Sequence, residues 1–368
     1  MGPVTDPAAF RAQFPVLERV SYMNAGTEGP LPQRAADVVR ERIAAEVTGG
    51  RAGKAYMEGV RGLAGDLRDG YARVLGCDPA DVALTGSTTD GVNTVLSGLS
   101  LRTGDEILTS DEEHPGLLAP LGRLKRLAGV TVTVAPFAQI ADAVTSSTRL
   151  VACSHVSWVS GQVVDTTALA ASGVPFLLDA AQGVGAVPVD VHALGCAFYA
   201  GSGQKWLCGP EGSGCLYVSR EQLDGLTVPW PGYGSLADAS QALDSGPAEN
   251  AARFDHGFPP GLRSAWALAS LGVFEEAGWE WVHGRATELA AGLAGSLAER
   301  GLKVGPRGSS TLVAWKPSAA ADLDAEVARL AEAGFVVRSI PSHGLIRASV
   351  GAWSSEEELA ALVDAAAA

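Results

Sequence analysis

Between residues 106 and 218 the chain repeats one pattern, in which a short uninterrupted apolar run alternates with a segment of helical spacing. Apolar runs that do not alternate with polar residues are typical of strands buried on both faces of a parallel sheet. Helices must then cover both faces, so we predict an α/β fold with ligands at the carboxyl ends of the strands. The predicted strands are Glu106–Thr109, Val130–Val134, Leu150–Cys153, Val174–Leu178, Ala197–Ala200 and Gly214–Val218.

The rest of the chain predicts a second, smaller α+β unit. A stretch rich in Gly, Pro and Ser, Pro229–Arg253, reads as a long loop that serves as a lid or a subunit contact. Ser354 followed by Glu357 fits a capping box at the start of the last helix. The elements predicted here are helices Leu262–Ala277, Trp281–Arg300 and Leu323–Ala333, and strands Thr311–Trp315, Phe335–Ser339 and Leu345–Ser349.

Charge and composition narrow the classes of function. The formal net charge is −14, which argues against a nucleic-acid-binding surface of clustered Lys and Arg. No apolar run is long enough to span a bilayer, and Met1–Phe14 does not resemble a signal peptide, so we expect no membrane partner. The five cysteines are scattered and form no C-x-x-C pair, so we expect neither a disulfide framework nor a metal site. The expected location is the cytoplasm.

Lys205 lies in a loop of small and polar residues that directly follows a predicted strand. A lysine that forms a Schiff base with a cofactor needs open surroundings, and Gly201 and Gly203 would let a cofactor approach the backbone. Ser202 and Gln204 could donate hydrogen bonds to a phosphate. The alternative for this loop is an ordinary turn with a surface lysine.

Two further segments place polar groups where strands end. Asp179 follows a buried apolar strand, where a carboxylate needs a cationic partner such as a protonated pyridine nitrogen. Thr88 and Thr89 open a helix after another strand, and helix N-termini bind phosphate groups. Taken alone, each segment is explained more simply as a helix N-cap.

His114 and Arg347 complete the set of candidate site residues. His114 follows a strand and could lie on the face of a ring, or decorate a surface loop. Arg347 lies within an apolar strand, where its guanidinium needs a carboxylate from a substrate or from a structural Asp or Glu. Together these segments supply the contacts that pyridoxal 5'-phosphate (PLP) catalysis requires, so the sequence predicts a PLP enzyme with the cofactor on Lys205.

Read together, these residues resemble the class V aminotransferase family, which includes the cysteine desulfurases. The strongest likeness lies in Leu178–Val218, with the elements D-A-A-Q-x-x-G-x-x-P-V-D, L-G-C-x-F-Y and S-G-x-K-W-x-x-G-P-x-G-x-G. The spacing from Asp179 to Lys205 is also that of the family. The likeness extends from the opening Tyr22–Thr27 to the R-A-S-V motif at Arg347, so it covers nearly the whole chain.

The resemblance implies a fold type I PLP enzyme, with a seven-stranded, mainly parallel sheet in a large domain and a small α+β domain built from both termini. We expect the large domain at residues 21–255 and the small domain at residues 1–20 and 256–368. It also implies a homodimer that acts on an amino acid. The implied roles are cofactor attachment and proton transfer by Lys205, a pairing of Asp179 with the pyridine nitrogen, a hydrogen bond from Gln182 to the phenolic oxygen, ring stacking by His114, phosphate binding by Thr88, Thr89, Ser202 and Gln204, and binding of the substrate α-carboxylate by Arg347.

Three positions depart from the family pattern. Gln204 stands where the family often has His. Phe258 stands where relatives often place a threonine that reaches the phosphate of the other subunit, which puts that contact in doubt. Trp158 stands where desulfurases usually carry an asparagine near the ring. The candidates for the substrate side of the site are Asn24, Trp158, Trp206, Arg338 and His343.

The reaction is the least determined feature. A cysteine desulfurase needs a nucleophilic cysteine on a loop of the C-terminal domain, but no cysteine follows Cys215. Three outcomes stay open, namely β-elimination from a sulfur-containing amino acid (a C–S lyase), transamination, and epimerisation. We favour the lyase because the Q-K-W-L-C-G-P-E-G run and Trp158 look most like the cystine-lyase and isopenicillin-epimerase-like branches.

Two rivals from other classes rank lower. A non-catalytic protein with the PLP-enzyme fold would have no need of Lys205, Asp179 and Arg347 together. A nucleotide-dependent α/β enzyme is disfavoured because no G-x-G-x-x-G or P-loop motif follows any predicted strand.

Overall fold

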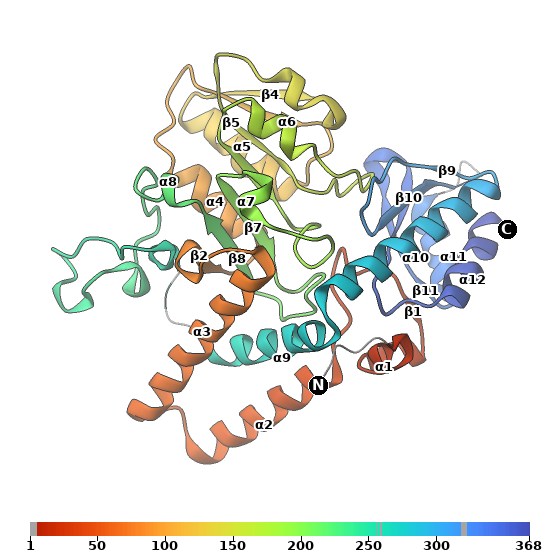
Figure 1. The fold of residues 1–368 in the computed structure, drawn as a ribbon, viewed down its shortest axis with the longest axis horizontal. Coiled ribbons are helices and arrows are strands. Elements are labelled where there is room, and N and C mark those ends of the chain that lie inside the picture. Colours follow the sequence, from red (N-terminus) through yellow and green to blue (C-terminus); the bar gives the residue numbers. More distant parts are fainter. Residues whose placement is uncertain (1–5, 256, 258–259, 318–321) are drawn as a thin grey trace.

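A seven-stranded sheet forms the centre of the larger part of the molecule (Figure 1). The computed structural model describes residues 6–255, 257, 260–317 and 322–368. The strand order is β2-β8-β7-β6-β5-β3-β4, and β8 alone among these strands runs against its neighbours. The mainly parallel α/β sheet predicted from the sequence is therefore confirmed. The strands are β2 (Val82–Thr85), β3 (Glu106–Ser110), β4 (Thr131–Ala135), β5 (Thr148–Ser154), β6 (Phe176–Asp179), β7 (Phe198–Ser202) and β8 (Gly214–Val218).

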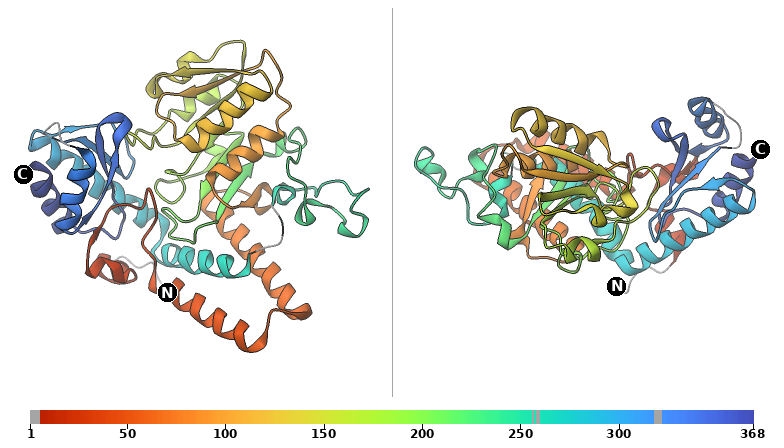
Figure 2. Two further views of the ribbon diagram at one scale, coloured as in Figure 1. Left: turned by 180° about the vertical axis from the view of Figure 1, so that it is seen from behind. Right: turned by 90° about the horizontal axis from the view of Figure 1, so that it is seen from above.

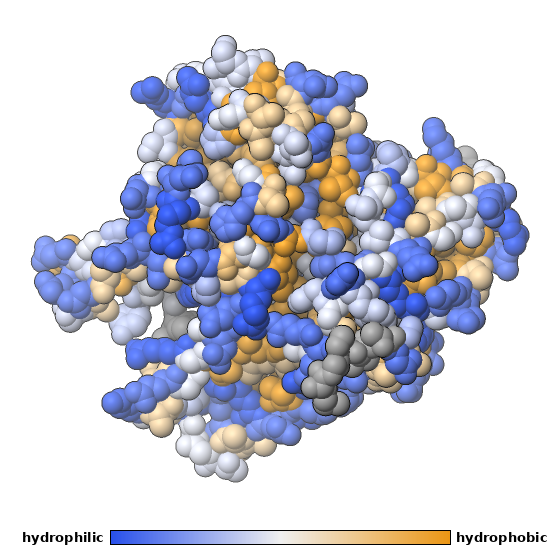
Figure 3. All heavy atoms as spheres, viewed as in Figure 1, coloured by the Kyte–Doolittle hydropathy of each residue, from blue (hydrophilic) through white to orange (hydrophobic). Residues whose placement is uncertain are grey.

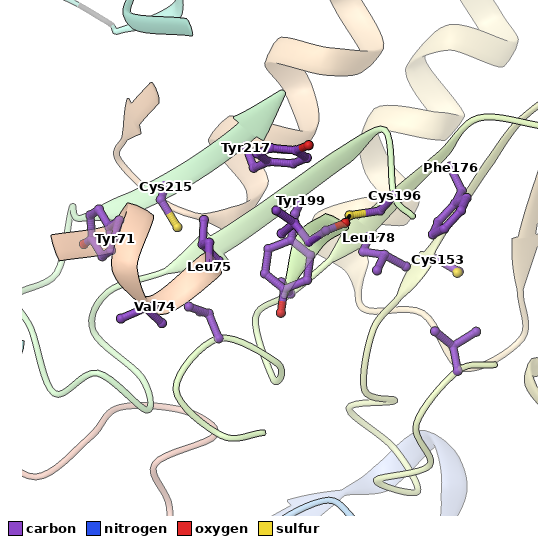
Figure 4. Close-up of a cluster of buried hydrophobic side chains, with 14 of the residues drawn as sticks. Tyr71, Val74, Leu75, Cys153, Phe176, Leu178, Cys196, Tyr199, Cys215 and Tyr217 are labelled. Carbon is purple, nitrogen blue, oxygen red and sulfur yellow. Dashed lines mark hydrogen bonds between the residues drawn. The ribbon is translucent and has the colours of Figure 1, made fainter. Parts of the chain in front are cut away.

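Both faces of this sheet are buried, which explains why its strands read as uninterrupted apolar runs. Leu178 and Tyr199 belong to one core cluster, whereas their chain neighbours Leu177 and Phe198 belong to another. Figure 4 shows the first cluster, where side chains of α3 meet those of the strands. The covering helices are α3 (Gly53–Leu75), α6 (Thr166–Ala171) and α7 (Val191–Leu194) on the first face, and α4 (Thr88–Gly98), α5 (Pro115–Leu127) and α8 (Arg220–Leu223) on the second.

The carboxyl edge of the sheet is polar. Each of the strands β2, β3, β5, β6 and β7 ends on a residue that can form hydrogen bonds. Because these strands run in one direction, their last side chains gather at a single edge. These last residues are Thr85, Ser110, Ser154, Asp179 and Ser202.

A second, four-stranded antiparallel sheet of order β12-β13-β10-β9 forms the smaller part of the molecule (Figure 2). Apolar side chains of α10 and α12, among them Leu293 and Leu362, pack with Trp315 and Ile346 of this sheet. The predicted small α+β unit is thus present. Its elements are β9 (Lys303–Val304), β10 (Leu312–Lys316), β12 (Arg338–Ile340), β13 (Leu345–Ser349), α10 (Trp279–Glu299), α11 (Leu323–Glu332) and α12 (Glu356–Ala367).

The N-terminal segment and α9 (Gly261–Ala277) join the two parts. Phe10 of α1 (Pro7–Arg11) and Phe14 shortly after it pack against Phe274 of α9. α9 also lies along α2 (Gln33–Gly49) and α3 (Figure 1). The sequence analysis did not identify α2 and α3. The domain boundaries at residues 20/21 and 255/256 stay a prediction. That prediction assigns α9 to the small domain, whereas the helices on which α9 packs are assigned to the large domain.

Two local predictions need correction. The strand predicted at Phe335–Ser339 is split into β11 (Phe335–Val336), which pairs with β1 (Ser21–Tyr22), and β12. The capping box lies one residue later than predicted, where the Ser355 hydroxyl accepts from the Glu358 N–H and the Glu358 carboxylate accepts from the Ser355 N–H. Both registers fit the S-x-x-E pattern, and a bidentate contact of Glu358 with Arg11 favours the later one.

The stretch predicted as a loop, Pro229–Arg253, extends away from the sheet and contains only short 3-10 turns (Figure 1). Its surface mixes hydrophilic and apolar residues, whereas larger apolar areas lie toward the middle of the same face (Figure 3). Trp230 and Tyr233 are exposed on it. Within the described ranges, no helix combines the length and apolarity that crossing a membrane would require.

Candidate functional site

A cavity of about 240 Å³ opens at the polar carboxyl edge of the large sheet. It brings together residues from six separate parts of the chain, among them Lys205 and Asp179. A larger cavity of about 460 Å³ lies at the opposite edge, near Phe176 and Ala197, and contains none of the predicted residues. The residues lining the first cavity are Gly26, Thr27, Ser87, Thr88, Thr89, His114, Asp179, Ala181, Ser202, Gln204, Lys205 and Arg338.

Lys205 reaches this cavity from the loop after β7. The backbone N–H of Gly29 donates to the carbonyl of Gln204 at 2.8 Å, which ties the lysine loop to the N-terminal segment. The pKa of Lys205 is lowered to about 8, mainly by burial and also by Arg347 and Arg338, whereas Asp179 acts in the opposite direction. A substantial fraction of the amine is therefore neutral near pH 8, the form that attacks a carbonyl carbon.

The glycines beside Lys205 have a different purpose from the one predicted. A side chain at Gly203 would clash with the Ser213 hydroxyl and would lie 2.7 Å from the Tyr71 hydroxyl. At Gly201 it would meet Val184 at 2.9 Å. The missing side chains thus make room for protein atoms, so these glycines allow the loop to pack closely and do not open a path for the cofactor.

Asp179 is buried at the end of β6. One carboxylate oxygen accepts from the Ala181 N–H at 3.0 Å. Burial raises the pKa of Asp179, while that hydrogen bond and the nearby Lys205 lower it. The chain after Asp179 forms turns and no α-helix begins there, so the N-cap explanation does not apply. A buried carboxylate facing a cavity favours a cationic ligand atom.

The start of α4 forms the opposite end of the cavity. Ser87 caps the helix, and the Thr88 hydroxyl lies 2.7 Å from the Ser202 hydroxyl. The Gln204 side-chain oxygen is buried without a hydrogen-bond partner among the described residues. Hydroxyls, a side-chain amide and a helix N-terminus are a donor set suited to a phosphate. Thr89 also lines the cavity.

His114 and Trp158 form an aromatic pair beside the cavity. Their ring centroids are 5.0 Å apart with an interplanar angle of 87°. His114 caps α5, with Nδ1 accepting from the Gly116 N–H at 3.0 Å. Burial lowers the pKa of His114 to about 4, with Lys205 and the arginines adding to the effect. The imidazole is therefore neutral at pH 7 and suited to contact with a ring.

Two guanidinium groups approach this side of the site from the small sheet. Arg347 of β13 is fully buried and donates to the backbone carbonyl of Trp158, but its Nε and second Nη have no hydrogen-bond partner within the described part of the chain. Burial and Arg338 lower the pKa of Arg347 to about 9. Arg338 donates to the Thr27 hydroxyl at 3.1 Å and lies 5.8 Å from the Trp158 ring centroid. Unpaired buried donors of this kind suit an anionic ligand.

Four other predicted residues have other surroundings. The Gln182 amide donates to the Gly26 carbonyl at 2.8 Å and accepts from the Trp206 indole at 3.0 Å, which leaves one amide hydrogen for a ligand. Trp206 is otherwise buried in apolar packing, and His343 is exposed. Neither lines the cavity. The Asn24 side-chain oxygen accepts from the Thr27 hydroxyl at 2.8 Å, and the same hydroxyl accepts from Arg338. Phe258 lies outside the described residues.

Sequence reasoning missed a buried carboxyl group next to this edge. Glu113 accepts from the Ser110 hydroxyl at 2.5 Å and from the Ser154 hydroxyl at 2.6 Å, and so joins the ends of β3 and β5. Burial raises its pKa to about 7 against these hydrogen bonds, with a further increase from Asp179. The only signal in the sequence was an acidic residue directly before His114, which resembles a surface turn.

Glu113 makes a testable contribution to the pH dependence of stability. In the unfolded chain it ionises near its ordinary value of 4.5, whereas the folded protein keeps the proton up to about pH 7. Its stabilising effect is present below pH 4.5 and is lost as the pH rises to about 7, by at most about 3 kcal/mol. We expect Glu113→Gln to remove this part of the decline in unfolding free energy between pH 5 and pH 8, measured by urea unfolding.

The control is Glu106→Gln, at the start of β3, the strand that Glu113 follows. Hydrogen bonds from Thr148 and Thr133 lower the pKa of Glu106, so it stays ionised across this range. Glu106→Gln should leave the difference between pH 5 and pH 8 unchanged. If Glu113→Gln declines with pH as steeply as the wild type, Glu113 does not keep its proton in the folded protein.

A family model for class-V aminotransferases matches residues 24–362, a span that contains all of the residues described around the cavity. The chain belongs to the class-V aminotransferase family. The expected family and its enzymatic nature are thereby confirmed.

The relatives within this family differ in reaction. Isopenicillin N epimerase of Streptomyces clavuligerus is 31% identical over 281 residues, which cover 71% of this chain and 67% of the relative. The cysteine desulfurase of Klebsiella pneumoniae (strain 342) is 33% identical over 308 residues, which cover 73% of each chain. Membership in the family therefore does not select one reaction.

Two solved structures of C-DES share 28% sequence identity with the chain. In one, glycine is covalently linked to the PLP cofactor; it has a TM-score of 0.92 and the match covers 97% of this chain and 98% of that chain. The other is the complex of this cystine C–S lyase with its product cysteine persulfide. It has a TM-score of 0.91, and the match covers 96% of this chain and 99% of that chain. The expected fold type I architecture is confirmed by this likeness.

Proposed function

We propose that the protein is a PLP-dependent enzyme that acts on an α-amino acid, with the cofactor attached to Lys205. The observation that carries this proposal is the convergence of Lys205, Asp179 and Ser202 on one cavity at the carboxyl edge of the sheet. An amine, a buried carboxylate and a set of hydroxyl donors match the aldehyde, the pyridine nitrogen and the phosphate of PLP. The PLP carried by C-DES supports the same assignment.

PLP supplies a ring that accepts the electron pair left when a bond to the substrate α-carbon breaks. Asp179 would hold a proton on the pyridine nitrogen, because its carboxylate is buried and has few other partners. Lys205 would take the proton from the α-carbon, since its lowered pKa lets the Nζ atom act as a base near neutral pH. His114, which is neutral and lines the cavity, would hold the cofactor ring in orientation. Gln182 would direct its remaining amide hydrogen to the phenolic oxygen.

Arg347 would bind the substrate α-carboxylate. The guanidinium is fully buried, and two of its nitrogens have no hydrogen-bond partner in the described part of the chain. A substrate carboxylate would supply the missing charge and two acceptors. Arg338 donates to the Thr27 hydroxyl, which donates to Asn24, and the Arg338 guanidinium lies over the Trp158 ring.

We further propose that the reaction is β-elimination from a sulfur-containing amino acid, with release of pyruvate, ammonia and a thiol or persulfide. All five cysteines precede the small sheet in the chain; four are buried, and Cys77 is half-buried next to Asp81, near the opposite edge. Burial raises the pKa of Cys208, whose sulfur packs near Gly29. No described thiol therefore lines the cavity to accept sulfur, which favours elimination over a persulfide on the enzyme.

The test is a substrate screen on the PLP-loaded protein with cystine, cysteine and their S-conjugates. Pyruvate, sulfide and keto acids are assayed with and without an added keto acid. We expect pyruvate to form without added keto acid. Turnover that requires a keto acid would instead establish an aminotransferase, and loss of the α-hydrogen in deuterated water without pyruvate would establish an epimerase.

The epimerase is the second candidate, because isopenicillin N epimerases of two organisms are 31% and 32% identical to the chain. Transamination is the third candidate, because its only support is the name of the family. We also propose that the protein forms a homodimer in the cytoplasm. The exposed Trp230 and Tyr233 support a subunit contact at the extended stretch, and five free cysteines are compatible with a reducing compartment.

A further inference from the structure

Glu112 directly precedes the buried Glu113. Its side chain holds in place the turn that follows the neighbouring strand β5. Its carboxylate accepts hydrogen bonds from the hydroxyls of Ser157 and Ser160, the second at 2.6 Å. Both serines are buried. The Ser157 hydroxyl also accepts from the backbone N–H groups of Val159 and Ser160 at 3.1 Å, so the carboxylate, the hydroxyls and the backbone form one network. Hydrogen bonds to an ionised carboxylate are among the stronger ones in proteins.

The turn held by this network carries Trp158, which contacts three groups of the site. Its backbone carbonyl accepts from Arg347, its ring meets the His114 ring edge-on, and the Arg338 guanidinium lies over it. Among the described residues, the Trp158 carbonyl is the one hydrogen-bond acceptor for the Arg347 side chain, so the direction of that guanidinium depends on the position of the turn.

The same turn also touches the small sheet. Gly161 has a φ of +85°, and a side chain there would lie 2.8 Å from the Leu312 carbonyl and 3.0 Å from the Ser310 hydroxyl. β10 starts at Leu312 and pairs with β13, which carries Arg347. The turn at 157–161 therefore contacts both the arginine and the strand next to it.

We propose that Glu112 is a positioning residue for substrate recognition, acting through Ser157, Ser160 and the Trp158 carbonyl on the orientation of Arg347. This inference rests on the proposed function, in which Arg347 binds the substrate carboxylate. Glu112 does not line the cavity. Without its charge the turn loses its anchor, and Arg347 no longer presents its two unpaired nitrogens in a fixed direction.

The experiment compares two amines on the PLP-loaded enzyme, glycine and methylamine, which differ by the carboxylate. The apparent Kd of each is measured by titration of the cofactor's absorbance. We expect Glu112→Gln to weaken glycine about tenfold, the scale of one hydrogen bond to a charged group, and to leave methylamine within about twofold. Ser160→Ala, which removes one of the two hydroxyls, should weaken glycine in the same direction by less, and provides a second variant should Glu112→Gln fail to fold.

Two further variants separate the possible failures. Glu106→Gln is the matched control, because Glu106 also accepts from hydroxyls, among them those of Thr133 and Thr148, but lies at the start of β3, whereas Glu112 follows its end. It should leave both amines unchanged. Arg347→Ala should weaken the binding of glycine and leave the binding of methylamine unchanged. If Arg347→Ala has no effect on glycine, the carboxylate role in the proposed function is wrong. If Arg347→Ala weakens glycine but Glu112→Gln does not, or weakens both amines equally, the positioning role of Glu112 is wrong while the proposed function stands.

Discussion

Lys205→Ala should abolish covalent attachment of PLP and reduce turnover by at least about a thousandfold. The expected size reflects the loss of both the attachment point and the base at the α-carbon, since general base catalysis alone contributes roughly 10²–10⁴-fold. Attachment is measured by borohydride reduction followed by mass spectrometry of the peptide that contains residue 205. In the wild type, attachment should become faster as the pH rises toward about 8, where the Lys205 amine loses its proton, and then level off.

The control is Lys125→Ala, which removes an exposed lysine of α5 in the same part of the molecule. It should retain full attachment and turnover. If the Lys205→Ala variant keeps full turnover, or if reduction labels another lysine in the wild type, the assignment of the site is wrong.

Asp179→Asn should lower kcat by about a hundredfold or more while leaving PLP attached to Lys205. The amide keeps the shape of the carboxylate and can still accept from the Ala181 N–H, but it has no charge to hold a proton on the pyridine nitrogen. Loss of one preorganised electrostatic contact at a reacting centre typically costs about 10²–10³-fold in rate. The measurement is kcat for the substrate found in the screen, with attachment checked by mass spectrometry.

Asp190→Asn is the matched control. Asp190 caps α7 by accepting from the N–H groups of His192 and Ala193, and so has the structural role that was the alternative for Asp179. Its replacement should leave kcat unchanged. An Asp179→Asn variant within a few-fold of the wild type would mean that the charge of Asp179 does not contribute to the reaction.

The sheet was predictable because burial on both faces leaves a local mark in the sequence. A strand such as β6 must be apolar at successive positions, and its first polar residue marks the carboxyl edge. Details that depend on partners distant in the sequence were less predictable. The choice of Ser355 over Ser354 as the helix cap agrees with the contact between Glu358 and Arg11, and that contact joins the two ends of the chain.

The same distinction holds for the site. Lys205, Asp179, His114 and Arg347 could be selected from the sequence because their residue types are chemically unusual at the ends of apolar strands or within them. The roles of Glu112 and Glu113 could not, because a carboxylate in a turn looks solvated until the neighbouring strand is placed beside it. Their partners Ser154, Ser157 and Ser160 lie on that strand and in the turn that follows it.

The sequence by itself determined the fold class and the chemical groups of the site, since burial periodicity and rare residue types are properties of short segments. Only the tertiary structure decided how those groups are held. It buried Arg347 with two nitrogens that have no partner among the described residues, placed Trp206 and His343 outside the cavity lining, and joined the turn of Trp158 to Glu112. Such contacts depend on which strands become neighbours in space, and no local pattern in the chain carries that information.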